Sequence, residues 1–153
     1  MSRFKKIIRW SLILVVVTFV AIQFVPVAHT NPTVQSPIQA PADVAAVLKK
    51  GCYDCHSHET NWPWYSHVAP VSWQIVEEVD EGRSELNFSN WGDYSPKKQA
   101  HKISEIWEEV ESNEMPPAKY LWLHSEAKLS DADRQVLRSW ARSHGDSETS
   151  DEH

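Results

Sequence analysis

The sequence predicts an all-α protein, with one modest helical domain behind an N-terminal transmembrane helix. Apolar residues recur at helical spacing in four segments after the N-terminal region, and no segment shows the alternating pattern of a strand. The composition includes eight Trp but only four Gly, which suits a helical domain that packs large rings around something flat or irregular. A chain of 153 residues has room for one domain once its ends are set aside.

The first 28 residues combine a basic start with a long uncharged run. Four basic residues stand within the first nine positions, and residues 10–28 carry no charge. This run has about the length that spans a hydrocarbon core as a helix. The basic residues before it predict a signal anchor at residues 1–28, single-pass in the cytoplasmic (inner) membrane, with the C-terminal domain in the periplasm or outside. A signal peptide cleaved after Ala28 is the alternative.

Composition divides the remaining chain into three parts. Residues 29–41 contain several prolines and no sustained periodicity, so we expect an extended linker. Residues 42–143 carry the helical periodicity and form the predicted domain. Residues 144–153 are mostly acidic or hydroxyl-bearing, which predicts a disordered acidic tail. The formal net charge of −6, in spite of the basic N-terminus, argues against a nucleic-acid partner.

Four helices are predicted within the domain, each from its own start and stop signals. They cover about residues 41–50, 70–86 and 95–115, and a last stretch from Ser130 onwards. Gly51 is the stop signal of the first helix. Ser95 caps the third, with Pro96 at its first helical position, and the prolines after residue 115 end it. Ser130 and Asp133 are arranged as a capping box at the start of the fourth.

The segment Cys52-Tyr53-Asp54-Cys55-His56 is a C-x-x-C-H motif, the signature of c-type haem attachment. Two thiols three positions apart on one helical turn can each reach a vinyl group on the same porphyrin edge. The adjacent imidazole can then bind the iron. We therefore predict one covalent haem c, attached at Cys52 and Cys55, with His56 as an iron ligand.

Two other uses of this motif stay open from the sequence. A structural disulfide or a thiol–disulfide oxidoreductase also uses C-x-x-C, although such an enzyme needs a strand leading into the motif and a parallel sheet around it. A zinc site is the second, with His58 and His67 joining the two thiolates. A zinc site or a structural disulfide would make the protein a zinc- or disulfide-stabilised interaction module rather than a haem protein.

Met115 is the predicted second iron ligand. It is the only Met besides the initiator, and it directly precedes Pro116 and Pro117. Paired prolines hold a thioether on a stiff, extended loop. A lone Met is usually a core residue, but this polar loop offers no obvious core to fill. Among the histidines outside the motif, His101 on the third predicted helix is the most credible substitute.

Six short motifs together carry a family resemblance. They are Cys-Tyr-Asp-Cys-His-Ser at 52–57, Asn-Trp-Pro-Trp-Tyr-Ser at 61–66, Ala-Pro-Val-Ser-Trp at 69–73, Leu-Asn-Phe-Ser at 86–89, Glu-Met-Pro-Pro at 114–117 and the segment 121–129. The chain resembles the bacterial haem-binding domain family of small membrane-anchored proteins over about residues 42–143. The order of motif, Met-Pro-Pro loop and closing helix also resembles a class I cytochrome c domain. The resemblance implies a helical cytochrome c-like fold and haem attached at Cys52 and Cys55 with proximal ligation by His56, but no defined physiological reaction.

The predicted ligands favour electron transfer. An iron with His and Met on its two faces has no open position for a substrate, and Met raises its potential into the range of electron carriers. We therefore expect a one-haem electron carrier rather than an enzyme. It would work with a redox partner protein, and acidic faces on the second and third helices would steer a basic one. An open sixth position would instead give a gas or redox sensor or a peroxidase-like enzyme.

Overall fold

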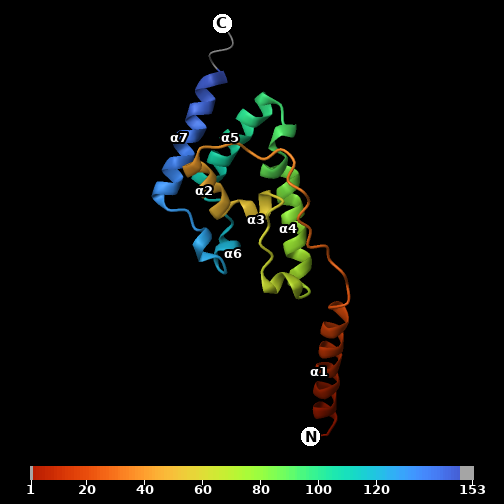
Figure 1. Ribbon diagram of the computed structural model, residues 1–153. Coiled ribbons are helices and arrows are strands. Elements are labelled where there is room, and N and C mark those ends of the chain that lie inside the picture. Colours follow the sequence, from red (N-terminus) through yellow and green to blue (C-terminus); the bar gives the residue numbers. More distant parts are fainter. Residues whose placement is uncertain (1, 149–153) are drawn as a thin grey trace.

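The computed structural model describes residues 2–148, which fold into helices and connecting loops without a strand. The longer helices are α1 (Ser2–Ile22), α2 (Ala42–Gly51), α4 (Val71–Glu85), α5 (Pro96–Glu111) and α7 (Asp131–Glu148) (Figure 1). The short ones are α3 (Tyr53–His56), α6 (Ala118–Leu121) and the 3₁₀ turns η1 (Trp64–His67), η2 (Phe88–Asp93) and η3 (Ser125–Ala127). The predicted all-α class is confirmed.

The helix starts follow the local sequence signals. Ser95 Oγ accepts a hydrogen bond from the Lys98 backbone N–H at 3.3 Å, as an N-cap does. Ser130 and Asp133 form the predicted capping box: Ser130 Oγ accepts from the Asp133 N–H at 3.2 Å, and Asp133 Oδ2 accepts from the Ser130 N–H at 2.8 Å. The end of α5 differs from the prediction. It stops at Glu111, before the prolines, because Asn113 adopts a left-handed backbone conformation with φ of 65°.

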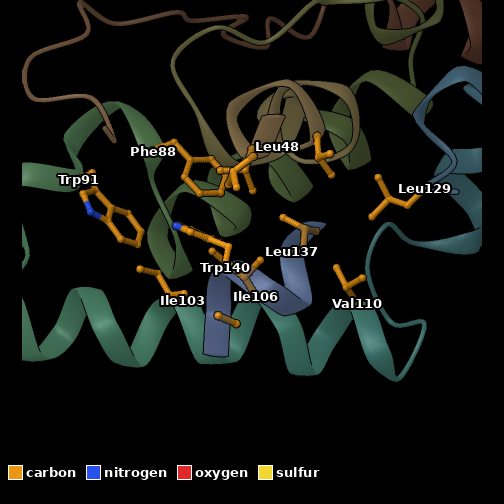
Figure 2. Packing of buried hydrophobic residues seen from close by; sticks show 12 residues of the cluster. Leu48, Phe88, Trp91, Ile103, Ile106, Val110, Leu129, Leu137 and Trp140 are labelled. Carbon is orange, nitrogen blue, oxygen red and sulfur yellow. The ribbon is translucent and has the colours of Figure 1, made fainter. Parts of the chain in front are cut away.

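The hydrophobic core lies between α2, η2, α5 and α7. Its buried members are Val44, Val47, Leu48, Phe88, Trp91, Ile103, Ile106, Val110, Leu129, Leu137, Trp140 and Ala141. Figure 2 shows Leu137 and Trp140 of α7 packed between α5 and the layer that holds Leu48 and Phe88. This core fixes α2 against α5 and α7, and it therefore fixes both the end of α2, where the C-x-x-C-H motif begins, and the end of α5, where the Met115 loop begins.

Helix α1 projects from the domain (Figure 1). Its end is attached through Gln23, which donates from Nε2 to the Ala69 carbonyl at 3.1 Å and accepts from the Ala69 N–H at 2.9 Å. Among residues 2–148, no helix is long and apolar enough to cross a membrane. The transmembrane helix predicted for residues 1–28 is therefore not found, because α1 ends at Ile22 and includes the basic residues of the first nine positions.

The segment at residues 29–41 contains no helix or strand, and it lies against the domain. The Ile38 N–H donates to the Phe88 carbonyl at 2.8 Å, and the Gly92 N–H donates to the Ser36 carbonyl at 3.0 Å. These bonds pair the segment with η2, so it does not hang free as a tether. Helix α7 also continues to Glu148, beyond residue 144 where the acidic tail was predicted to begin. The rest of that predicted tail lies outside the described residues.

Candidate haem-binding site

The C-x-x-C-H motif forms one helical turn at the bend between α2 and α3. Cys52 ends α2 and caps α3 with φ −125° and ψ −31°, so the helix axis changes direction at this residue. The N–H groups of Cys55 and His56 both donate to the Cys52 carbonyl, at 3.2 and 3.0 Å. This turn holds the three motif side chains close together. Both cysteines are free thiols.

The imidazole of His56 is oriented by the backbone of α4. Its Nδ1 lies 2.8 Å from the Gly82 carbonyl oxygen and 3.2 Å from that of Leu86. A carbonyl oxygen only accepts, so Nδ1 carries the proton and Nε2 keeps its lone pair for a metal. Burial lowers the pKa of His56, and Lys102 lowers it further, while the two backbone hydrogen bonds act in the opposite direction. A neutral, oriented imidazole is the form that binds iron.

Gly82 allows α4 to approach the motif this closely. A Cβ at this position would lie 2.7 Å from the Cys55 carbonyl oxygen and 3.2 Å from Cys55 Cβ. Any side chain here would push α4 away from α3 and lengthen the bond between His56 and the Gly82 carbonyl. The sequence reasoning missed this residue, although a lone Gly inside a predicted helix was the available signal.

The loop that carries Met115 is fixed at the end of α5. The N–H groups of Glu114 and Met115 both donate to the Glu109 carbonyl at 3.0 Å. From α7, Arg134 donates to the Val110 carbonyl and, at 2.8 Å, to Oδ1 of Asn113. The loop is therefore held by the last turn of α5 and by a cation from α7. Arg134 is a second functional residue that the sequence reasoning missed.

The four predicted site residues surround one hollow. Two adjoining cavities of about 360 and 270 Å³ share Gly51, Cys52, His56, Glu85 and Met115 in their walls, and Cys55 lines the smaller one. Two half-buried thiols, an imidazole with a free Nε2 and a thioether thus face the same space. Thiols that can form thioethers and soft or imidazole iron ligands are the donor set that haem uses, so the residues present fit a haem.

Carboxylates dominate the charge around this hollow. Its lining includes Glu78, Glu81, Glu85, Glu105, Glu108 and Glu109, together with the cations Lys102 and Lys119. Lys102 pairs with Glu105 at 2.7 Å. The walls of the hollow are therefore acidic, and any macromolecule that meets this opening encounters a negative potential.

The electrostatic environment of the thiols does not suit a thiol–disulfide oxidoreductase. Burial, and then the neighbouring Cys55, raises the pKa of Cys52 to about 12. Burial, and then the carboxylate of Asp54, raises the pKa of Cys55 to about 11. Reactive cysteines of such enzymes have a lowered pKa, because the thiolate is the nucleophile. Both thiols here are neutral at pH 7.

The other candidate histidines have partners other than the thiols. His58 accepts from Asn87 Nδ2 at 2.9 Å, and its Nδ1 lies 3.3 Å from the Thr33 carbonyl. The His67 ring packs on His29, with centroids 4.2 Å apart. His101 is 68% exposed and pairs with a Glu on its own helix. Within residues 2–148 no group of three or more His, Cys, Asp or Glu side chains is placed to hold a metal ion.

A comparison with family models decides the family. The model described as "Haem-binding domain" matches residues 17–143. The chain belongs to this family. The predicted family is thus confirmed. Membership in the haem-binding domain family supports haem as the cofactor. The matched range begins inside α1 and ends inside α7, so it includes the C-x-x-C-H motif and the Met115 loop. No curated protein and no solved structure matches the chain.

Proposed function

We propose that the protein is a one-haem electron carrier of the c type. Cys52 and Cys55 attach the haem through thioether bonds, and His56 and Met115 bind its iron. The orientation of His56 is the observation that carries this proposal. Its Nδ1 is committed to two backbone carbonyls of α4, and its ring lines the hollow that Met115 lines from the loop after α5.

A bound haem supplies one-electron exchange at its iron. The chain's own residues would set the conditions for that exchange. Met115 favours ferrous iron, and burial of the ligands limits the reorganisation of water around the metal. His56 keeps its proton on Nδ1 throughout, because both carbonyl partners only accept. With His56 and Met115 both binding the iron, the site would exchange electrons and would leave no position for a substrate.

Covalent attachment is tested on protein made together with a cytochrome c maturation system. After denaturation the chain should keep its haem stain and give the pyridine haemochrome spectrum of a haem with two saturated vinyl groups. Substitution of Cys52→Ala together with Cys55→Ala should remove both signals. Haem that extracts from the unmutated chain into acid acetone would overturn the covalent assignment.

The acidic lining of the hollow supports a basic redox partner. Carboxylates on α4 and α5 line the hollow, and a positively charged partner surface would complement them. Reduced protein should therefore transfer electrons faster to a cationic oxidant, such as hexaammineruthenium(III), than to anionic hexacyanoferrate(III) once driving force is allowed for. The advantage should fall as salt is added. Equal rates with both oxidants would count against a basic partner.

We also propose that the domain works on the outer face of the cytoplasmic membrane, with α1 holding it there. The apolar side chains of α1 are exposed rather than packed on the domain, for example Leu14 at 66% and Val16 at 61%. Fractionation should find the holoprotein with membranes, with an N-terminal sequence that begins near Met1. A soluble product that begins after Ala28 would instead establish cleavage.

A further inference from the structure

A second cleft lies beside Cys55, and Met115 is not among the residues that line it. It has a volume of about 170 Å³ and is formed by the segment 60–65, the first turns of α4 and the stretch from α6 to His124. Asp54, Cys55, Glu78, Lys119 and Tyr120 line both this cleft and the smaller cavity of the haem hollow. A molecule in the cleft would therefore share a wall of these five residues with a haem in the hollow.

The size and lining of this cleft suit one ring of an apolar molecule. Its walls are built mainly from the side chains of Trp62, Pro63, Val71, Ile75, Val79 and Leu123. An apolar cavity of about 150 Å³ in a protein takes up a benzene ring. The cleft is slightly larger than that, so a single substituted ring fits it.

One corner of the cleft holds a hydrogen-bonded relay. His124 Nδ1 lies 3.0 Å from a carboxylate oxygen of Glu126, which only accepts, so the imidazole proton is on Nδ1. His124 Nε2 therefore accepts the hydrogen bond from the Tyr65 hydroxyl. The Tyr120 ring stacks on the imidazole at 4.3 Å and 13°, which holds its plane. The Tyr65 oxygen still has a lone pair for a ligand hydroxyl in the cleft, and the relay ends in solvent because the Glu126 side chain is 72% exposed.

The mouth of the cleft is apolar and adjoins the end of α1. Val71 is 45% exposed and Leu123 is 66% exposed. Gln23, just after α1, bonds to Ala69, two positions before Val71. In Figure 1, α6 and the start of α4 lie at the end of the domain from which α1 projects. A lipid-soluble molecule that collects around the exposed apolar side chains of α1 would meet this mouth.

We propose that this cleft binds the ring of a lipid-soluble hydroquinone and that the protein oxidises it. The inference rests on the proposed electron-carrier function and names its donor. Space for one ring, a hydroxyl next to a proton acceptor, an apolar mouth and a wall shared with the haem hollow are what hydroquinone oxidation needs, and this cleft has all four.

The electron and proton balance is as follows. A hydroquinone loses two electrons and two protons and becomes a quinone, with both O–H bonds broken and two C=O bonds formed. Each electron reduces one ferric haem to the ferrous state, so two haems are reduced per hydroquinone. The proton of the hydroxyl that meets Tyr65 passes through the Tyr65 hydroxyl to His124 Nε2, and the Nδ1 proton then leaves towards Glu126 and water. The proton of the hydroxyl at the opposite end of the ring goes to water. Because each chain carries one haem, the second electron goes to a second ferric holoprotein.

Binding and reduction are tested separately on the full-length holoprotein in detergent, without oxygen. Durohydroquinone is the probe. Equilibrium dialysis against ferrous protein measures binding with no turnover, and stopped-flow absorbance with ferric protein measures reduction. We expect saturable binding and two ferrous haems formed for each durohydroquinone consumed. Reduced methyl viologen, a one-electron donor that carries no proton, reports whether the haem itself remains reducible.

Two variants and a control locate the site. Val71→Trp should fill the mouth and weaken durohydroquinone binding by about tenfold or more. The matched control is Val25→Trp, the same change at a valine that is 51% exposed and outside the cleft, and it should bind as wild type does. Tyr65→Phe keeps the ring but removes the hydroxyl. It should slow reduction by durohydroquinone by about 100-fold and leave reduction by methyl viologen unchanged.

Several outcomes overturn the inference. Equal binding by wild type and Val71→Trp would show that the cleft is not the site. An equal loss of rate with durohydroquinone and methyl viologen in Tyr65→Phe would show that the hydroxyl has only a structural role. A holoprotein that methyl viologen reduces but durohydroquinone neither binds nor reduces would refute this inference and leave the electron carrier standing. A chain without covalent haem would refute the proposed function itself.

Discussion

The substitution Gly82→Ala tests the contact that orients His56. The added Cβ would start 2.7 Å from the Cys55 carbonyl oxygen, and such contacts do not occur below 3.0 Å. That oxygen belongs to the backbone, so no flexible side chain can move aside. Helices α3 and α4 must therefore separate, and the 2.8 Å bond from His56 to the Gly82 carbonyl must lengthen with them.

The expected magnitude follows from three opposing effects. Overpacking a tight contact costs about 1–3 kcal/mol, and weakening one buried hydrogen bond costs about 1 kcal/mol. Ala is a better helix former than Gly by about 1 kcal/mol, which offsets part of the loss. We expect the free energy of unfolding to fall by about 2 kcal/mol. We also expect less covalent haem per chain and a shifted reduction potential, since the imidazole is no longer held in place.

Gly92→Ala is the matched control for this prediction. Its Cβ would start 2.8 Å from Ser36 Cβ, where η2 meets the segment 29–41, away from the haem hollow. Both variants replace Gly by Ala, so the conformational entropy of the unfolded chain falls by the same amount in each. Chemical denaturation of the two holoproteins should show a loss of stability in each, while absorbance spectra and potentiometry should change only for Gly82→Ala. A wild-type spectrum and potential in Gly82→Ala would refute the reasoning, as would equal spectral changes in both.

Three further predictions concern the Met115 loop and α7. Met115→Ala should open the sixth position, so that the ferrous protein binds carbon monoxide readily and the reduction potential falls; unchanged spectra would show that Met115 is not a ligand. Arg134→Met removes the donor to the Val110 carbonyl, and carbon monoxide should then displace the intact thioether faster than in wild type. Asp133→Asn should lower the free energy of unfolding by about 1 kcal/mol at pH 7. The hydrogen bond from Lys50 lowers the pKa of Asp133 from 3.8 to about 2. The difference in stability between wild type and Asp133→Asn, measured by their denaturation midpoints, should therefore vanish as the pH falls through that range.

Features that depend on a few neighbouring positions could be predicted from the sequence. The capping box of Ser130 and Asp133 needs only residues three positions apart, and both of its hydrogen bonds form. The same holds for the Ser95 cap of α5. The C-x-x-C-H spacing similarly predicts one turn, and the motif turn exists as α3. In each case the interacting groups lie within one helical turn, so the chain itself brings them together.

Features that depend on contacts between distant segments could not be predicted. Gly82 is needed because the backbone of Cys55 passes beside it. A lone Gly inside a predicted helix indicates a close approach, but it does not indicate which segment approaches. Arg134 reaches the end of α5 only after α7 has packed on it. The segment 29–41 has the composition of a free linker, yet backbone groups of η2 pair with it. The sequence predicts too long an N-terminal helix, because the uncharged run continues to residue 28 whereas α1 ends at Ile22.

An electron that comes from a hydroquinone in the cleft and goes to a basic partner would enter and leave the protein by different faces. The cleft and the larger cavity share no lining residue. The cleft beside Cys55 opens through Val71 and Leu123, which are apolar, whereas the larger cavity between His56 and Met115 is lined by carboxylates such as Glu105. A neutral ring is not attracted by carboxylates, and a basic protein gains little from an apolar mouth. Val71→Trp should therefore slow reduction of the haem by durohydroquinone and leave its oxidation by hexaammineruthenium(III) unchanged. Glu105→Gln should slow the oxidation by hexaammineruthenium(III) and leave the reduction by durohydroquinone unchanged. Should both substitutions slow both half-reactions in rapid-mixing experiments, the two faces would not act independently and a single shared docking surface would replace them.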